Sequence, residues 1–467
     1  MKKTLKRIIS LLLAINMAFS YVPVLAHGLE LEIVEGTEIA ETDEVESGEG
    51  TVSEAEEAEE EYFAEETGEQ SIVPLYCEIA VNQGQLDPAN GEIIENEIYG
   101  YVVDYKLKKG HTLSISNTDY VFSVRKLADG NYNTMLKQAT ASNFVATEDM
   151  TVGMLIRKPD KSAVTAEELA SIKIIDSQYG MIGVSGYAHR FTVEAETIDG
   201  GTAATRANIF LPASYSEEGE ATPLVIMTNG RHGYITDSVW NGNKTDDVAV
   251  MKHYMESGYA VLVVDNTAGA VNGIDDWGNP QLVDSYFKAY EYVQKNLNVE
   301  ELFYIHSRSM GTFAAIRIMR EHPELVKCAL MCGATASLRS RFGQNPEFIA
   351  KRFGFDDTTG ATWEADKVIG YDPYVDVVGA VEYDLPPTFW MLSEADANST
   401  VLKMIENIEA HGNDVEIKIY TETDHSGVCR LNIEECRTDA LAYLEAHQES
   451  EAEHRYYAWT VTKEATC

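Results

Sequence analysis

Segments of strand character alternate with segments of helix character from residue 191 to residue 447, and no other feature constrains the fold as strongly. Runs such as Leu262-Val263-Val264 are apolar on both faces, which is what the central strands of a parallel sheet require. Parallel neighbours are joined by helical crossovers, so the alternation predicts a doubly wound, mostly parallel α/β domain. Ligands of such a sheet bind beyond the carboxyl ends of its strands, and we expect the chemistry there.

This α/β domain is expected over residues 179–447, followed by a C-terminal tail over 448–467. It begins with a strand pair over 191–213 that turns at Gly200-Gly201. Further strands are expected over 223–228, 259–265, 302–307, 326–332, 388–393 and 415–421. Helices are expected over 246–257, 282–296, 311–321, 400–411 and 433–447. The stretch at about 335–387 is longer than one connecting helix needs, which predicts a small cap over the site.

The preceding part of the chain, over residues 73–178, has a different pattern. Its β-rich stretches are 101–105, 112–116, 120–124 and 152–156. Turn residues such as Gly110 and Asp129-Gly130 separate them. This pattern predicts an all-β, sandwich-like domain.

The N-terminal residues have the composition of an export signal. A basic start is followed by the apolar stretch 8–19 and by Val24-Leu25-Ala26, which predicts a signal peptide over residues 1–26 that is cleaved after Ala26. We therefore expect a secreted or extracellular protein. An uncleaved anchor is the less favoured alternative because the apolar stretch is short. Residues 27–72 contain 18 acidic and no basic side chains, and this self-repelling composition predicts a disordered spacer.

The net charge of −40 argues against nucleic acid as a partner, because phosphate binding needs a positive field. Residues 73–467 still carry 32 basic and 58 acidic side chains, so the part expected to fold is itself acidic.

Neither a membrane span nor a metal site is indicated by the rest of the sequence. No later apolar run approaches the roughly 20 residues that span a bilayer, and no membrane span is expected. The six cysteines match no zinc pattern. Cys429 and Cys436 are close enough in sequence to bridge, but spacing alone predicts no disulfide.

A serine lies where the expected strand 302–307 passes directly into a helix. The sequence there is Ser307-Arg308-Ser309-Met310-Gly311. A serine in such a turn stands clear of the backbone, and the next N–H, that of Met310, points to where an oxyanion would form. Ser307 stands where glycine is usual, although it is small enough for the close approach of strand and helix. Taken alone, Ser309 could equally be a helix cap.

Two further polar residues follow the ends of later strands. Asp396 comes just after the strand 388–393, and His425 comes just after the strand 415–421. A catalytic serine needs a base near its hydroxyl, and the base needs a carboxylate that fixes its tautomer. Singly, Asp396 would be interpreted as a turn residue and His425 as a loop residue. The order Ser309, Asp396, His425 at successive strand ends predicts a catalytic triad, with Glu394 as the reserve acid.

With these motifs, residues 185–447 resemble the α/β-hydrolase superfamily. The resemblance is strongest to secreted bacterial acyl-ester hydrolases and to the catalytic domains of prolyl-oligopeptidase-like serine peptidases. It implies that Ser309 is the nucleophile, that His425 is the general base and then the acid, and that Asp396 orients His425. The expected reaction is acyl transfer to water, and neither a metal nor an organic cofactor is implied.

The same resemblance implies a second oxyanion donor in the loop that follows the strand 223–228. This loop is Asn229-Gly230-Arg231-His232-Gly233, and the backbone N–H of Arg231 is the candidate donor beside that of Met310. His232 and Trp277 are candidate contacts of the substrate, although each could instead be a packing residue.

Three interpretations of function remain open. A carboxylic ester hydrolase acting on a small-molecule or glycan-linked ester is favoured, because residues 73–178 are too short for the propeller that prolyl-oligopeptidase-like enzymes usually carry. The alternatives are such a serine peptidase and a non-catalytic surface-binding protein on a hydrolase scaffold. The β-domain resembles accessory domains of secreted hydrolases, which implies a contact with a cell surface or polysaccharide. A plain packing module is equally open.

Overall fold

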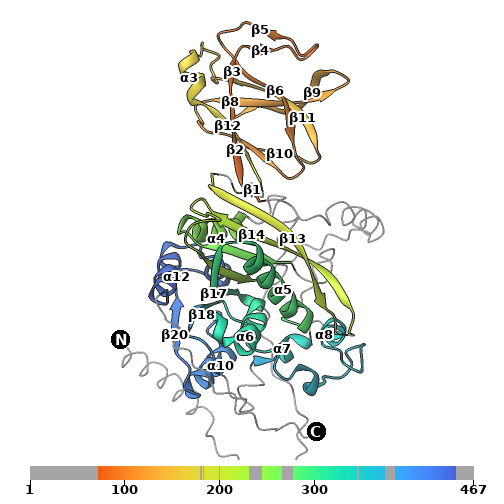
Figure 1. The fold of residues 1–467 in the computed structure, drawn as a ribbon, viewed down its shortest axis with the longest axis vertical. Coiled ribbons are helices and arrows are strands. Elements are labelled where there is room, and N and C mark those ends of the chain that lie inside the picture. The colour runs from red at the N-terminus through yellow and green to blue at the C-terminus, as the bar shows by residue number, and fades with distance from the viewer. Residues whose placement is uncertain are drawn as a thin grey trace, which may run out of the picture. The chain divides into compact units, whose positions relative to one another are not determined.

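The computed structural model describes residues 72–178, 181, 183–198, 200–230, 245–265, 277–343, 346–373 and 384–448. The predicted signal peptide and nearly all of the predicted spacer and C-terminal tail lie outside these residues. Strands dominate from β1 to β12, whereas strands and helices alternate from β13 onward (Figure 1). None of the described helices is long and apolar enough to cross a membrane.

The largest sheet within the described residues has nine strands, in the order β1-β13-β14-β16-β15-β17-β18-β19-β20. Their bounds are β1 Val73–Pro74, β13 Gly186–Glu196, β14 Thr202–Pro212, β15 Thr222–Thr228, β16 Ala260–Val264, β17 Val299–Arg308, β18 Val326–Cys332, β19 Thr388–Ser393 and β20 Val415–Tyr420. The strands from β15 to β20 pair in parallel, and β1, β13 and β14 pair antiparallel with their neighbours. The chain runs from β15 to β16 on one side and then crosses back to β17 on the other side of β15, so the strand order reverses between β15 and β17 and forms a topological switch point there.

Helices cover both faces of this sheet. They are α4 Thr245–Glu256, α5 Pro280–Asn296, α6 Thr312–Glu321, α10 Ser399–Ala410, α11 His425–Cys429 and α12 Glu434–Ala446. Alternate residues of β15 enter two separate cores, with Leu224 and Ile226 in one and Val225 and Met227 in the other. The predicted doubly wound, mostly parallel α/β fold is confirmed.

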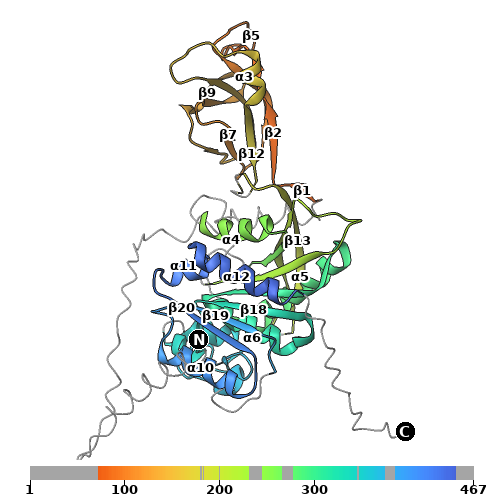
Figure 2. The same ribbon diagram turned by 90° about the vertical axis from the view of Figure 1, so that its left-hand side faces the viewer.

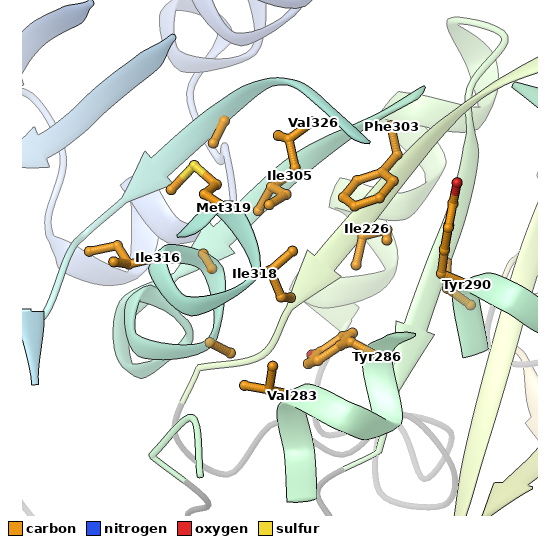
Figure 3. Packing of buried hydrophobic residues seen from close by; sticks show 14 of the residues in the cluster. Ile226, Val283, Tyr286, Tyr290, Phe303, Ile305, Ile316, Ile318, Met319 and Val326 are labelled. Atoms are coloured by element: carbon orange, nitrogen blue, oxygen red, sulfur yellow. The ribbon is translucent and has the colours of Figure 1, made fainter. Parts of the chain in front are cut away.

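Each core has its own set of helices. The first takes buried side chains from α5, α6 and α10, and Figure 3 shows Val283 of α5 and Ile318 of α6 beside the strand residue Ile226. The second core takes buried side chains from α4 and α12, which lie with α11 on the same side of the sheet (Figure 2). The strand that leads to Ser309, β17, contributes residues to both cores, so its end is held from two sides.

Residues 76–177 form smaller antiparallel sheets. A five-stranded sheet has the order β3-β6-β11-β8-β9, a four-stranded sheet the order β10-β7-β12-β2, and β4 pairs with β5. The bounds are β2 Tyr76–Ala80, β3 Asn82–Gln83, β4 Gln85–Leu86, β5 Ile93–Ile94, β6 Gly100–Leu107, β7 Thr112–Ile115, β8 Val121–Ala128, β9 Asn131–Thr140, β10 Phe144–Val145, β11 Met150–Arg157 and β12 Lys173–Ser177. Leu113 and Ile174 of the four-stranded sheet share a core with Phe122 and Val152 of the five-stranded sheet. This is the predicted all-β, sandwich-like architecture.

Two details differ from the sequence-based expectation. Val73–Pro74 pairs with β13 of the large sheet, although the sequence boundary assigns it to the β-domain. A short helix, α3 Ala166–Ser171, also lies within the β-domain, where only strands were expected. It begins with a capping box between Thr165 and Glu168, and this local signal is independent of hydrophobic periodicity.

The segment after β18 contains short helices where a cap was expected. They are α7 Leu338–Phe342, α8 Pro346–Arg352 and the 3₁₀ helix η5 Ala365–Val368. Their aromatic side chains pack on one another, for example Phe342 against Phe355 and Trp363. The same cluster includes Met310 from the turn after β17, so the cap segment packs directly beside that turn.

Candidate active site

Ser309 occupies a strained turn between β17 and α6. Its φ of 49° lies in the left-handed region, which a residue with a side chain adopts only at a cost. Gly311 permits the turn, because a Cβ atom there would lie 2.5 Å from the carbonyl oxygen of Thr228 at the end of β15. Strand and helix therefore meet so closely that only glycine fits at this position. The turn holds the Ser309 hydroxyl clear of the backbone, as the sequence motif predicts.

Ser307 fits this turn despite the departure from the usual glycine. The residue is completely buried on β17, opposite Thr228 of β15 and Met331 of β18. Its hydroxyl has no hydrogen-bond partner in the described part of the chain. Close packing from both neighbouring strands thus accepts a serine side chain without distorting the ladder.

His425 lies within hydrogen-bond distance of Ser309. Its Nε2 atom is 3.0 Å from the Ser309 Oγ atom, and its Nδ1 atom is 2.6 Å from Oδ1 of Asp396. His425 is the first residue of the one-turn helix α11, which Asp424 caps by accepting a hydrogen bond from the Gly427 N–H. The structure therefore brings the three predicted residues together in a single hydrogen-bonded line.

Asp396 is buried behind the imidazole and held in place by the end of β19. Its Oδ2 atom accepts hydrogen bonds from the backbone N–H of Ser393 at 3.1 Å and from the Ser393 hydroxyl at 2.7 Å. Burial alone would raise the pKa of Asp396, but the hydrogen bond from His425 and those from Ser393 hold this pKa below its ordinary value. Asp396, rather than the reserve residue Glu394, is thus the ionised partner of the imidazole.

The direction of each hydrogen bond follows from the groups involved. An ionised carboxylate can only accept, so Nδ1 of His425 carries the hydrogen and Nε2 is left to accept from the Ser309 hydroxyl. The hydrogen bond to Asp396 raises the pKa of His425 above its ordinary value and makes the imidazole a stronger base. This arrangement can remove the proton from Ser309 as the hydroxyl attacks a carbonyl carbon.

Gly230, at the start of the predicted oxyanion loop, lies against Ser309. A Cβ atom on Gly230 would be 3.5 Å from the Cβ atom of Ser309. The preceding Asn229 is fixed by its side chain, which donates to the carbonyl oxygen of Val264 at 2.7 Å and accepts from Arg308 at 3.1 Å. Arg231 and His232 lie outside the described residues, so their predicted roles stay predictions.

Met310, the other predicted oxyanion donor, lies in the 3₁₀ turn η3 Ser309–Gly311 at the start of α6. The first N–H groups of a helix have no partner within the helix, which leaves them available to an anion. The Met310 side chain is buried, together with Trp277, in the hydrophobic cluster that Ile349, Phe353 and other side chains of the cap segment form. Trp277 is itself only 3% exposed, with its ring edge-on to Phe313 of α6. The structure therefore shows Trp277 as a packing residue, and its contact with a substrate remains a prediction.

Cys429 is a neighbour of His425 that the sequence did not single out. Its Sγ atom lies 3.8 Å from Nε2 of His425 and 3.4 Å from the carbonyl oxygen of Cys332. Gly333 makes room for both side chains, because a Cβ atom there would be 2.5 Å from that sulfur and 2.9 Å from Nδ1 of His425. The i, i+4 spacing of residues 425 and 429 would have indicated this contact only if α11 had been predicted as a helix.

The five cysteines in the described part of the chain are all free. Cys77 is exposed, and Cys328, Cys332, Cys429 and Cys436 are buried. Cys429 and Cys436, which sequence spacing left open as a pair, are therefore not bridged.

The strand order and the turn at Ser309 give this part of the chain the α/β-hydrolase fold, and the line from Ser309 through His425 to Asp396 lies where that fold places its site. No protein-family model and no curated protein sequence matches the chain.

Several solved structures are similar to this region. An S-formylglutathione hydrolase from Agrobacterium tumefaciens shares 17% identity over 56% of this chain and 95% of its own, with a TM-score of 0.40. The fluorophosphonate-binding serine hydrolase F of Staphylococcus aureus shares 14% over 54% of this chain and 97% of its own, with a TM-score of 0.41. A Pyrococcus horikoshii acylaminoacyl peptidase shares 11% over 56% of this chain, which spans only 42% of that peptidase, with a TM-score of 0.41. Similarity this low transfers no activity, so function has to be argued from the site itself.

Proposed function

We propose that this chain is a secreted serine hydrolase that cleaves carboxylic esters through an acyl-enzyme. The single observation that carries the proposal is the pair of distances at His425, 3.0 Å to the Ser309 hydroxyl and 2.6 Å to the Asp396 carboxylate. A base in contact with both a hydroxyl and an ionised carboxylate is the arrangement that activates a serine nucleophile.

In the first half of the reaction, Oγ of Ser309 bonds to the ester carbonyl carbon while Nε2 of His425 takes the hydroxyl proton. The carbonyl oxygen becomes an oxyanion, which accepts a hydrogen bond from the backbone N–H of Met310, with the N–H of Arg231 as the second donor predicted from the sequence. His425 then gives its proton to the alkoxy oxygen, the bond from carbon to that oxygen breaks, and the alcohol leaves.

In the second half, water attacks the acyl carbon of the Ser309 ester. His425 accepts a proton from this water and returns it to Oγ of Ser309 as the acid leaves. Asp396 stays ionised throughout and stabilises the imidazolium that forms in each half. The side chains of this chain therefore balance every proton without a metal or an organic cofactor.

The experiment that tests the proposal is covalent labelling with a fluorophosphonate. The wild-type protein should be labelled at Ser309, and Ser309→Ala should take up no label while keeping the same melting temperature. Absence of label on a folded wild-type protein would instead indicate a non-catalytic scaffold.

The bond that is cleaved needs a separate comparison. Turnover of p-nitrophenyl acetate should exceed turnover of a dipeptide nitroanilide, because the described β-domain forms small antiparallel sheets rather than propeller blades. The opposite ranking would favour the peptidase alternative. Secretion is tested by fractionating the producing cells and sequencing the mature N-terminus, which is expected to follow Ala26.

A further inference from the structure

A second histidine lies beneath the candidate active site and takes no part in the proposed chemistry. His306 is on β17, three residues before Ser309, and is completely buried. Its Nδ1 atom lies 2.6 Å from the hydroxyl oxygen of Tyr254 on α4. Its Nε2 atom lies 3.3 Å from the backbone carbonyl oxygen of Cys429 on α11. His306 thus connects the strand of the nucleophile to the helix of the base.

The chemistry of the two partners fixes the direction of both hydrogen bonds. A backbone carbonyl can only accept, so Nε2 of His306 carries the hydrogen and donates it to Cys429. In a neutral imidazole the other nitrogen then accepts, and the hydroxyl of Tyr254 donates to it. Burial raises the pKa of Tyr254 well above its ordinary value, which keeps the hydroxyl protonated for this purpose.

The helix that carries His425 is held at its far end by backbone hydrogen bonds and by the side chain of His306. α11 has only five residues, and such a single turn has little stability of its own. Its N-terminal end is capped by Asp424. At its other end, the carbonyl groups of Ser426, Gly427 and Val428 accept hydrogen bonds from the backbone N–H groups of Arg430, Asn432 and Leu431. The Cys429 carbonyl comes next in the chain, and the side chain of His306 donates a hydrogen bond to it. Because the helix turns once between residues 425 and 429, a shift of this end also moves the imidazole of His425.

We propose that His306 is a positioning residue that anchors α11 to β17 and so sets the distance between His425 and Ser309. The proposal rests on the proposed function for its effect on rate, although the anchoring itself can be measured without any substrate. A misplacement of about 1 Å in a catalytic group lowers the rate on the order of 10²-fold. His306 should therefore act on kcat, since it touches no substrate, and leave KM nearly unchanged.

The test compares two substitutions of His306 with a matched control. His306→Leu removes both hydrogen bonds, whereas His306→Gln keeps an amide N–H for the Cys429 carbonyl and an oxygen for the Tyr254 hydroxyl. The control is His189→Leu, because His189 on β13 is also buried and its Nε2 atom also lies 2.9 Å from a tyrosine hydroxyl, that of Tyr292 on α5. Each full-length variant is assayed with p-nitrophenyl acetate, and hydrogen exchange of residues 425–431 is followed by mass spectrometry.

We expect His306→Leu to lower kcat on the order of 10²-fold with little change in KM, and to speed exchange over 425–431. His306→Gln should recover most of both losses, and His189→Leu should match the wild type in kcat and in exchange over 425–431. If His306→Leu proves unable to fold, Tyr254→Phe removes one hydroxyl and should speed the same exchange to a smaller extent.

The outcomes separate this inference from the proposed function. Unchanged exchange over 425–431 in folded His306→Leu or Tyr254→Phe would overturn the anchoring, whatever the activity. Faster exchange with no esterase activity even in the wild type would support the anchoring and count against the proposed function. A fall in kcat that Gln does not recover at all would point to lost packing and also overturn the inference.

Discussion

At the scale of single residues, Asp396 is the side chain that orients His425, the proposed base, and raises its pKa. Its replacement by Asn should lower kcat about 10⁴-fold, because the amide no longer stabilises the imidazolium and can favour the wrong tautomer. The carboxylate also raises the pKa of His425, and only the neutral imidazole can accept a proton. The acidic limb of the pH–rate profile should therefore lie above the ordinary histidine pKa of about 6.5 in the wild type and move to lower pH in Asp396→Asn.

The matched control for that measurement is Glu394→Gln, which removes a neighbouring carboxylate from the same loop. Steady-state kinetics across the pH range should show Glu394→Gln close to the wild type. A larger effect from Glu394 than from Asp396 would contradict the geometry in which Oδ1 of Asp396 lies 2.6 Å from His425.

A second prediction at the residue scale concerns the stability of the turn at Gly311. Gly311→Ala should destabilise the protein by about 1–3 kcal/mol, because its Cβ atom would meet backbone atoms of Thr228 that cannot move independently of β15. Gly343→Ala serves as the control, since a Cβ atom there would have no neighbour within 4 Å among the residues that the structure describes. Urea denaturation of both variants measures the difference, and equal midpoints would show that the turn can relax.

At the scale of elements, the cap segment should unfold together with the sheet. Ile349 of α8 is completely buried in the cluster that also holds Met310 and Phe313 next to β17. Ile349→Ala should therefore lower the free energy of unfolding of the whole domain by about 2–5 kcal/mol in one transition. Circular dichroism and tryptophan fluorescence, to which Trp363 of the cap contributes, should give coincident curves. A separate early transition in fluorescence would show that the cap opens independently.

Some of these strands and helices could be predicted from the sequence, and others could not. β18 and β19 have the bounds expected from their apolar runs, because strands buried on both faces need continuous hydrophobic sequence. The helix α11 was missed, since its five residues are too few to show a period, and with it went the contact between Cys429 and His425. The anchoring role of His306 was hidden for a related reason: its partners, Tyr254 and Cys429, are 52 and 123 residues away in the chain.

At the scale of the whole molecule, the acidity of the chain should favour some substrates over others. With a net charge of −40, the protein repels anions approaching its surface. At low salt, kcat/KM should be higher for a cationic ester than for an anionic ester of equal size, and the ratio should shrink as salt is added. Stopped-flow or plate assays at several ionic strengths check this. A ratio that does not depend on salt would indicate that local pocket chemistry outweighs the field of the molecule.

The size of α11 has a consequence for how this protein would respond to heat. Ser309 directly follows a strand that both cores hold, whereas His425 is carried on a single helical turn. Short segments of this kind open at lower free energies than central strands do. Catalysis should thus be lost reversibly several degrees before the sheet melts, so that the thermal ceiling for activity is a property of residues 425–429 rather than of the fold.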